Sequence, residues 1–242
     1  MAKIALVTGS SRGIGAAIAR RLAREFITVV NYRTGEAAAK AVVASIEAAG
    51  GNAIALPADL GSLADIEKLF AAISDRFGHL DVLVNNAAMG GGKSLEQIDA
   101  EHYERLFAVN VRGALFATKA AVTLFGANGG KIINITSGAA QAAPPGLSVY
   151  SATKAALEVM TRSHAAELGP RHITVNAVSP GITETDMLQE TIPVHVQLAM
   201  AANTALRRLG TPEDIADVVG FLTTEDARWI TGQIIGVNGG LR

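Results

Sequence analysis

Two residues four positions apart, Tyr150 and Lys154, offer a proton donor beside a fixed positive charge. They lie in the run 149–157, whose residues favour a helix, and residues at i and i+4 share one helical face. A free tyrosine has a pKa near ~10 and exchanges protons poorly at neutral pH. Because a nearby cation favours the phenolate, we expect Lys154 to lower the pKa of Tyr150 towards the operating pH, where general acid–base catalysis works best.

Two further features accompany this pair. The chain opens with a glycine turn that carries Gly9, Gly13 and Gly15 between an apolar strand and a helix. Such a turn places backbone N–H groups and the helix dipole against a phosphate, and after the first strand of a doubly wound sheet it indicates a dinucleotide site. A second apolar strand ends in Ser137, thirteen positions before Tyr150.

Apolar strand-like runs alternate with amphipathic helical runs along the whole chain. The predicted strands are Ile4–Thr8, Thr28–Asn31, Ala53–Pro57, Val82–Asn85, Ile132–Thr136, Thr174–Ser179 and Ile234–Val237. The predicted helices are Gly13–Glu25, Glu36–Ala49, Leu63–Phe77, Glu101–Phe125, Tyr150–Leu168 and Glu213–Thr223. Alternation of this kind predicts the α/β class, with one doubly wound Rossmann-type domain over residues 1–242 and a seven-stranded parallel sheet that carries helices on both faces.

Helix starts and connections support this order of elements. Ser62 with Asp65, and Thr211 followed by Pro212 and Glu213, are typical of helix N-termini. The stretch Thr183–Leu209 has no clear assignment, and long connections of this kind are often functional lids.

Composition excludes several classes of function. The 242 residues are 49% apolar and 18% charged, which is ordinary for a parallel sheet covered by helices. A net charge of −1 gives no electrostatic reason to expect nucleic acid, and the absence of cysteine excludes disulfides and thiolate chemistry. The five histidines show no metal-ligand spacing, so we expect no metal. The first strand begins almost at the chain start and no apolar run approaches a membrane span, so we expect a cytoplasmic protein without a signal peptide.

At this point the chain resembles the short-chain dehydrogenase/reductase family over about Lys3 to Gly240. The resemblance is carried by these residues: Thr8-Gly9-x-x-x-Gly13-x-Gly15, Asn85-Asn86-Ala87-Ala88, Asn110, Ser137, Tyr150-x-x-x-Lys154 and Pro180-Gly181. Ala88 stands where glycine is usual, and Thr183 stands where a branched apolar residue is common. The motifs fall in the family's order and at its spacing, so the resemblance implies a reductase or dehydrogenase that acts on CH–OH groups.

The resemblance implies a role for each polar residue of the site. Tyr150 would donate a proton to a carbonyl oxygen, or accept one from an alcohol, and Ser137 would hold the same oxygen. Lys154 would lower the pKa of Tyr150 and hold the nicotinamide ribose. Asn110 would support a water that relays protons to Lys154. Hydride would pass directly between the substrate carbon and the nicotinamide.

The glycine turn, the motif positions and the strand ends together define an expected cofactor site. The expected contacts are Gly9, Ser11, Arg12, Gly13, Ile14, Gly15, Asn31, Tyr32, Arg33, Asp59, Leu60, Asn86, Ala87, Tyr150, Lys154, Pro180, Gly181, Thr183 and Thr185. Asp59 resembles the family's adenine-edge contact, with a simple turn aspartate as the alternative. Asn85 could serve the cofactor or only tie strands together.

The second strand predicts which cofactor is used. An NAD pattern expects an acidic residue after this strand, and here the strand ends Val30-Asn31-Tyr32-Arg33-Thr34. Arg33, with Arg12 in the glycine turn, could hold a ribose 2′-phosphate. We therefore expect NADP(H) to be preferred and NAD(H) to be possible.

A second glycine-rich run, Gly90-Gly91-Gly92-Lys93-Ser94, looks like the end of a P-loop. A P-loop needs glycine five positions before Gly92, and that position is Ala87. A flexible loop beside the substrate is the better interpretation.

The substrate stays open between two classes of reductase. The chain resembles 3-oxoacyl carrier-protein reductases and small-molecule carbonyl reductases about equally. Carrier-protein reductases tend to present basic residues before the fifth strand, whereas 124–131 is basic only at Lys131, with Arg171 further on. This favours a free small-molecule carbonyl or alcohol.

Two classes of protein without turnover also have to be weighed, namely a non-catalytic dinucleotide sensor and an assembly-only protein. This chain keeps the full polar tetrad, which neither class would need. The resemblance also implies a homotetramer, or a dimer, formed through Glu101–Phe125, Tyr150–Leu168 and the C-terminal segment.

Overall fold

A parallel sheet with helices on both faces forms the core of the computed structural model, which describes residues 2–185, 188 and 193–241. The strands are β1 Ile4–Val7, β2 Ile27–Tyr32, β3 Asn52–Pro57, β4 Val82–Asn85, β5 Gly130–Ile135, β6 Ile173–Pro180 and β7 Ile234–Val237. They pair in the order β3-β2-β1-β4-β5-β6-β7, and every pairing is parallel. The predicted fold class is therefore confirmed.

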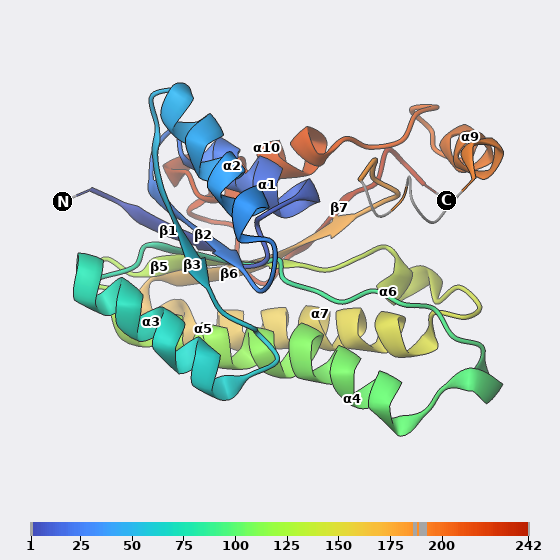
Figure 1. Cartoon of the computed structure of the whole chain (residues 1–242), viewed down its shortest axis with the longest axis horizontal. Helices are drawn as coiled ribbons and strands as arrows, with labels where there is room; N and C mark the ends of the chain where they lie inside the picture. The colour runs from blue at the N-terminus through green and yellow to red at the C-terminus, as the bar shows by residue number, and fades with distance from the viewer. Residues whose placement is uncertain (1, 186–187, 189–192, 242) are drawn as a thin grey trace.

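The helices form one layer on each face of the sheet (Figure 1). On one face lie α1 Gly13–Leu22, α2 Glu36–Ala48 and α10 Pro212–Leu222, and on the other lie α3 Leu63–Phe77, α4 Ala100–Phe107, α5 Ala114–Leu124 and α7 Ser148–Leu168. Two short or peripheral helices, α6 Ala139–Ala142 and α9 Val194–Ala202, lie at the end of the molecule that carries the carboxyl ends of the strands.

Strand alternation builds two separate apolar cores from one sheet. Successive strand side chains point to opposite faces. Ala5 and Val7 of β1 pack in the core under α1 and α10, whereas Ile4 and Leu6 pack in the core over α3, α5 and α7. Strand order reverses between β1 and β4, so the connections after these strands diverge and leave a crevice at their carboxyl ends.

Helix caps follow the sequence prediction with one change of partner. The Ser62 hydroxyl accepts a hydrogen bond from the Asp65 backbone at 3.3 Å and begins α3. Thr211 begins α10 with Pro212 at the first position, but Asp214 rather than Glu213 completes the reciprocal capping box.

The predicted helix Glu101–Phe125 is wrong as one continuous helix. It breaks into α4 and α5 around a π-helical turn, Ala108–Gly113. The wide turn carries Asn110, whose side chain bonds to the backbone of Met89. A Cβ on Gly113 would lie 2.3 Å from the carbonyl oxygen of Leu60, so the turn packs directly against the connection after β3. These tertiary contacts interrupt a sequence pattern that is otherwise helical.

Inside the stretch left unassigned by the sequence, the structure contains α9, which follows Pro193. Among the described residues, no helix is both long enough and apolar enough to span a membrane.

Candidate active site

Helix α7 places Tyr150 and Lys154 on one face, as the spacing predicts. The Lys154 ammonium lies 5.7 Å from the centre of the Tyr150 ring. Lys154 is only 3% exposed, and its Nζ donates a hydrogen bond to the Ile135 carbonyl at 2.9 Å, at the end of β5. Two residues further on, Ser137 shares a hydrogen bond with the Tyr150 hydroxyl. The structure thus brings Ser137, Tyr150 and Lys154 together at the carboxyl edge of the sheet.

The pKa of Tyr150 moves in the direction opposite to the sequence expectation. Burial has the largest effect and raises the pKa of the phenol, while the hydrogen bond with Ser137 acts in the lowering direction. Desolvation of a phenolate therefore outweighs the stabilising contacts that the protein provides. The consequence is a tyrosine that keeps its proton at neutral pH, as a proton donor must.

Burial also changes the proton affinity of Lys154. The pKa of its ammonium is lowered to about 8 from the usual 10.5, because burial disfavours the charged form. At neutral pH most molecules still carry the charge beside the Tyr150 ring.

Asn110 is buried and is fully engaged by the protein. Its Nδ2 donates to the Met89 carbonyl at 2.9 Å and to the Thr153 hydroxyl at 3.1 Å, and its Oδ1 accepts from the Met89 amide at 2.7 Å. Asn110 thus links the segment after β4 to α7, one residue before Lys154. The Asn110 side chain therefore holds the turn of α7 that precedes Lys154 against the segment after β4.

Hydrogen bonds among polar side chains inside the sheet show that Asn85 ties strands together. Its Nδ2 donates to Asn134 Oδ1 at 2.9 Å and to the Thr118 hydroxyl at 3.0 Å, and Asn134 Nδ2 donates to the Thr161 hydroxyl at 2.9 Å. Asn85 therefore ties β4 to β5 and to α5. The sequence analysis missed Asn134 and Thr161, whose only signal was a polar residue within an apolar strand and helix.

The glycine turn before α1 has no room for side chains. Gly9 has a φ of +61°, and a Cβ there would lie 2.8 Å from the Cα of Ala87. A Cβ on Gly15 would lie 2.5 Å from Nδ2 of Asn86. Among the residues that the structure describes, no side chain caps α1, so N–H groups of its first turn are available to an anion. This is the cradle that a pyrophosphate requires.

Two asparagines of the expected cofactor set hold this turn in place. Asn31 Oδ1 accepts from the Gly9 amide at 3.0 Å, and Asn86 Nδ2 donates to the carbonyls of Thr8 and Gly9 at 2.9 and 3.0 Å. Asn31 and Tyr32 are both buried, as is Leu60 at the next strand end. These three side chains therefore lie within the protein, behind the surface of the turn.

The segment after β6 approaches the same turn. The Gly181 amide donates to the Val237 carbonyl at 2.9 Å, and the Thr183 hydroxyl donates to the Gly181 carbonyl at 3.1 Å. A Cβ on Gly13 would lie 3.6 Å from the Thr185 methyl group. The structure thus brings the expected residues from Pro180 to Thr185 alongside the glycine turn.

A pocket lies at the carboxyl ends of β2 and β3, one side of it formed by α3. Its volume is about 310 Å³, and it is lined by Arg33, Pro57, Ala58, Asp59, Asp65 and Lys68. Arg33 Nη1 lies 4.0 Å from Asp59 Oδ2, and the Arg33 side chain is half exposed. Asp59 Oδ1 also accepts from the Gly61 amide at 2.8 Å. The sequence analysis missed Lys68, because its distance from Arg33 along the chain conceals their shared pocket.

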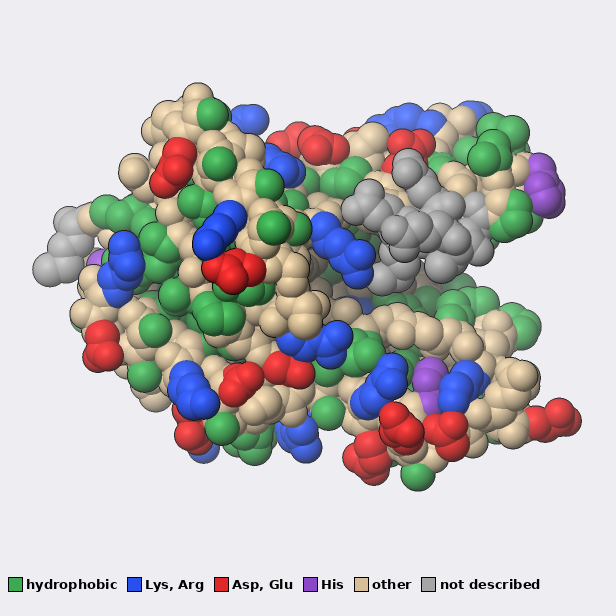
Figure 2. Space-filling view, viewed as in Figure 1, with side chains coloured by type: hydrophobic (Ala, Val, Ile, Leu, Met, Phe, Trp, Pro, Cys, Tyr) green, Lys and Arg blue, Asp and Glu red, His purple; other side chains and the backbone are tan. Residues whose placement is uncertain are grey.

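The run Gly90–Ser94 does not enter an α-helix, so its interpretation as a P-loop is excluded. A single 3₁₀ turn, Leu95–Gln97, follows it, and Lys93 Nζ pairs with Asp99 at 2.6 Å. The Lys93 amide donates to the Gly146 carbonyl at 2.9 Å, in the loop just before Tyr150. In the same view as Figure 1, the space-filling surface opens between the side that carries α9 and the side that carries α4 and α6 (Figure 2).

The fold and this site define a dinucleotide-binding oxidoreductase. A family model described as Enoyl-(Acyl carrier protein) reductase matches residues 9–242. The chain is 42% identical over 250 residues to a probable tetrahydroxynaphthalene reductase of Zymoseptoria tritici, covering 98% of this chain and 93% of that protein.

Two solved structures are also similar to this chain over nearly their whole length. The promiscuous reductase LugOII, which catalyses keto-reduction at C1 during lugdunomycin biosynthesis, has a TM-score of 0.93 and 45% identity, covering 99% of this chain and 97% of that chain. The angucycline C-6 ketoreductase LanV with bound NADP has a TM-score of 0.92 and 39% identity, covering 99% and 95%. The chain belongs to the short-chain dehydrogenase/reductase family, and it is an NAD(P)-dependent oxidoreductase that acts on CH–OH and carbonyl groups.

Proposed function

We propose that the protein is an NADP(H)-dependent reductase of ketones in free small molecules, and that it also oxidises the corresponding secondary alcohols. The observation that carries this proposal is the half-buried Tyr150, which keeps its proton, beside Ser137 and the Lys154 ammonium at the edge of the sheet where the glycine turn lies. When bound, NADPH supplies the hydride.

Each residue of the tetrad has one task in this proposal. Ser137 donates a hydrogen bond to the substrate carbonyl oxygen, and Tyr150 delivers the proton to that oxygen as it gains negative charge. Lys154 stabilises the tyrosinate that remains, because its ammonium lies beside the ring. Asn110 holds the Met89 backbone and Thr153 in position and thereby fixes the turn of α7 that carries Lys154.

The residues at the sheet edge fit NADP(H). The first turn of α1, which carries Gly13 and Gly15, would receive the pyrophosphate on its N–H groups. Glycine at positions 9 and 15 lets the turn pack closely against Ala87 and Asn86, where a Cβ would clash. Arg33 and Lys68 line the pocket beyond β2 and β3 together with Asp59 and Asp65, and the half-exposed Arg33 guanidinium can offer two-point hydrogen bonding to a 2′-phosphate. The similar ketoreductase LanV holds NADP. NAD(H) remains the weaker cofactor in this proposal.

We further propose an aromatic ketone as the substrate. The relatives that bear a substrate in their names include reductases of tetrahydroxynaphthalene, versicolorin and elsinochrome. The segment between β6 and α10 offers an apolar surface, since Val194, Leu198 and Leu206 are all more than 60% exposed. Aromatic rings gain binding free energy from contact with such side chains.

The structure offers little support for a carrier-protein substrate. Lys131 is the second residue of β5 and therefore lies at the opposite end of that strand from Ser137. Arg171, just before β6, donates a hydrogen bond to the Val122 carbonyl at 2.9 Å. Both basic residues lie at the amino edge of the sheet, away from Tyr150.

We also propose a cytoplasmic homotetramer, or a dimer, in which residues 1–242 act as one domain. Exposed apolar side chains favour association through α5, α7 and the C-terminal region, and they include Leu115, Val159, Phe221 and Trp229. Trp229 is 96% exposed just before β7, and burial of so large a side chain stabilises an interface.

The test is a panel of carbonyl compounds, followed by the loss of NADPH absorbance. The panel contains free aromatic ketones such as tetralones, aliphatic ketones, and a 3-oxoacyl thioester on a carrier protein. We expect turnover of the free ketones, with aromatic ketones preferred, and turnover lower by a factor of about 10² or more in the Tyr150→Phe variant. Preference for the carrier-bound thioester would support a carrier-protein reductase instead. NADPH binding without reduction of any carbonyl would indicate a sensor.

A further inference from the structure

The long segment between β6 and α10 begins and ends at the same place. Gly210 and Thr183 pair in parallel: the Gly210 amide donates to the Ile182 carbonyl at 3.0 Å, and the Glu184 amide donates to the Gly210 carbonyl at 2.8 Å. We call residues 182–184 and 208–211 the neck of this segment. In the sequence, α9 lies between the two parts of the neck. The neck therefore holds together the two ends of the segment that contains α9.

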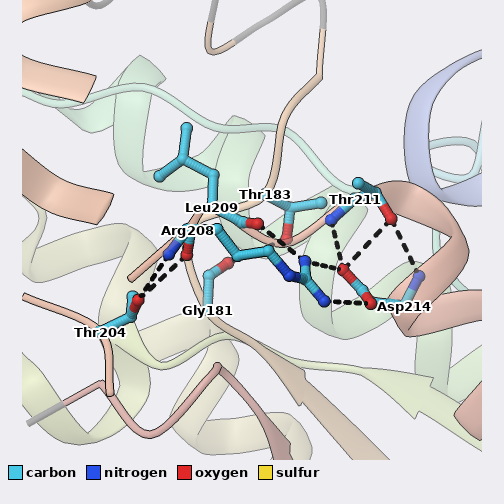
Figure 3. Close-up of polar contacts among 7 residues, drawn as sticks. All are labelled: Gly181, Thr183, Thr204, Arg208, Leu209, Thr211 and Asp214. Atoms are coloured by element: carbon cyan, nitrogen blue, oxygen red, sulfur yellow. Dashed lines mark hydrogen bonds and ion pairs between the residues drawn. The ribbon is translucent and has the colours of Figure 1, made fainter. Parts of the chain in front are cut away.

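A forked ion pair joins the neck to α10 (Figure 3). Arg208 Nη1 and Nη2 donate to the two carboxylate oxygens of Asp214 at 2.6 and 2.8 Å, and Nη1 also donates to the Leu209 carbonyl at 2.9 Å. Asp214 in turn accepts from the Thr211 amide at 2.7 Å and from the Thr211 hydroxyl at 3.2 Å. Two-point pairing of this kind fixes orientation as well as distance.

The charges of Arg208 and Asp214 favour the contact between them. Hydrogen bonding to Arg208 holds the pKa of the Asp214 carboxyl far below its usual range, so this group stays ionised. Hydrogen bonding to Asp214 raises the pKa of Arg208, and the charge of Glu184 adds a smaller effect in the same direction. The Arg208 side chain thus contacts the neck at Leu209 and α10 at Asp214.

The same residue also connects to the end of α9. The Arg208 amide donates to the Thr204 hydroxyl at 3.2 Å, and that hydroxyl lies within hydrogen-bond distance of the carbonyls of Arg208 and Ala201, at 3.0 and 2.9 Å. Ala201 belongs to the last turn of α9. Through Thr204, the backbone of Arg208 is joined to the end of α9, so the position of the Arg208 backbone and the position of α9 are linked.

On its other side, the neck determines where Gly181 to Thr185 lie. The Thr183 hydroxyl bonds to the Gly181 carbonyl, and the Thr185 methyl lies against the glycine turn at Gly13. One ion pair and two backbone hydrogen bonds therefore connect α10 to the residues that flank the dinucleotide cradle. The ion pair itself lies at the surface, since the side chains of Arg208 and Asp214 are 51% and 32% exposed.

We propose that Arg208 and Asp214 are positioning residues of the active site: they hold the neck so that residues 181–185 and α9 keep the geometry that binds the dinucleotide and the ketone. This inference rests on the proposed function. The competing explanation is that the pair only stabilises the start of α10, where Asp214 already completes the cap of Thr211.

The variant that separates the two roles is Arg208→Gln, which leaves the cap intact and removes the fork. Arg208→Lys restores the charge without two-point pairing. The matched control is Asp217→Asn, which breaks a different ion pair of α10, the 3.3 Å contact with Arg21 of α1. This contact lies away from the neck and joins two helices on the same face of the sheet.

We expect Arg208→Gln to weaken NADPH binding and to raise KM for the ketone, each by roughly threefold to tenfold, with a smaller change in kcat. Arg208→Lys should recover part of the loss. Hydrogen exchange of residues 181–185 and 194–211, measured without NADPH, should speed up in Arg208→Gln and stay unchanged in Asp217→Asn. Melting temperatures of all three variants should remain close to that of the wild type.

Unchanged exchange at 181–185, together with unchanged NADPH affinity in Arg208→Gln, would overturn the inference and leave the pair as a stabiliser of α10. A wild-type protein that reduces no ketone would instead overturn the proposed function, while exchange and NADPH affinity would still decide the role of Arg208. If Arg208→Gln does not fold, a loss of affinity in Arg208→Lys supports the inference and wild-type affinity refutes it.

Discussion

Burial of Lys154 makes the stability of this protein depend on pH in a specific way. The pKa of the ammonium is about 8 in the folded chain, and the usual value of 10.5 applies to the unfolded chain. Below pH 8 both states hold the proton, so the folded state carries the full cost of a buried charge. Between these two pKa values the unfolded state binds more protons, and stability therefore rises with pH.

The expected size of the effect follows from the two pKa values. A lowering from 10.5 to about 8 corresponds to about 3 kcal/mol in the free energy of unfolding, at roughly 1.4 kcal/mol per pKa unit. The gain is absent below pH 8 and complete near pH 10.5. Other groups titrate in the same range, so the quantity to measure is the difference between the wild type and Lys154→Met, in which these groups are shared.

The assay is urea unfolding followed by circular dichroism, at one protein concentration and at several pH values from neutral to alkaline. The wild type should gain about 3 kcal/mol relative to Lys154→Met across this range, and at neutral pH the variant should be at least as stable, because it removes a buried charge. Lys119→Met changes an exposed lysine and is the control. A difference between wild type and Lys154→Met that does not vary with pH would refute the reasoning.

Three further outcomes are expected. Tyr150→Phe should lose turnover by a factor of about 10² or more while its NADPH affinity stays that of the wild type; near-wild-type turnover would remove Tyr150 from the mechanism. Arg33→Asp should raise KM for NADPH by ~10- to 100-fold and affect NADH much less, since a hydrogen bond to a charged group contributes roughly 1.5–3 kcal/mol; a wild type that favours NADH would contradict this assignment. Light scattering at micromolar concentration should give the mass of a tetramer or a dimer, and a monomer mass would refute the proposed assembly.

The sequence predicted the features that depend on short stretches of the chain. All seven strands were expected from their apolar runs, and their observed bounds differ by at most two residues at either end. Tyr150 and Lys154 share one face because helical spacing alone determines it. The glycine turn was predictable because Gly9, Gly13 and Gly15 lie close together in the sequence.

The features that the sequence did not predict all depend on contacts between distant segments. The π-helical turn at Asn110 exists because Met89, 21 positions earlier, binds its side chain. The direction of the pKa of Tyr150 depends on burial by the whole site, which outweighs the hydrogen bond with Ser137. Helix α9 buries none of its residues in the described structure, so it lacks the apolar and polar faces from which a helix is usually predicted.

That property of α9 has a consequence for how this enzyme could change over generations or in the laboratory. A helix with no side chain in either core contributes little to the free energy of folding. Substitutions along Val194–Ala202 should therefore leave the stability of the sheet largely unchanged. Libraries randomised over this helix should yield mostly folded proteins, so screening can explore new substrates instead of losing variants to aggregation.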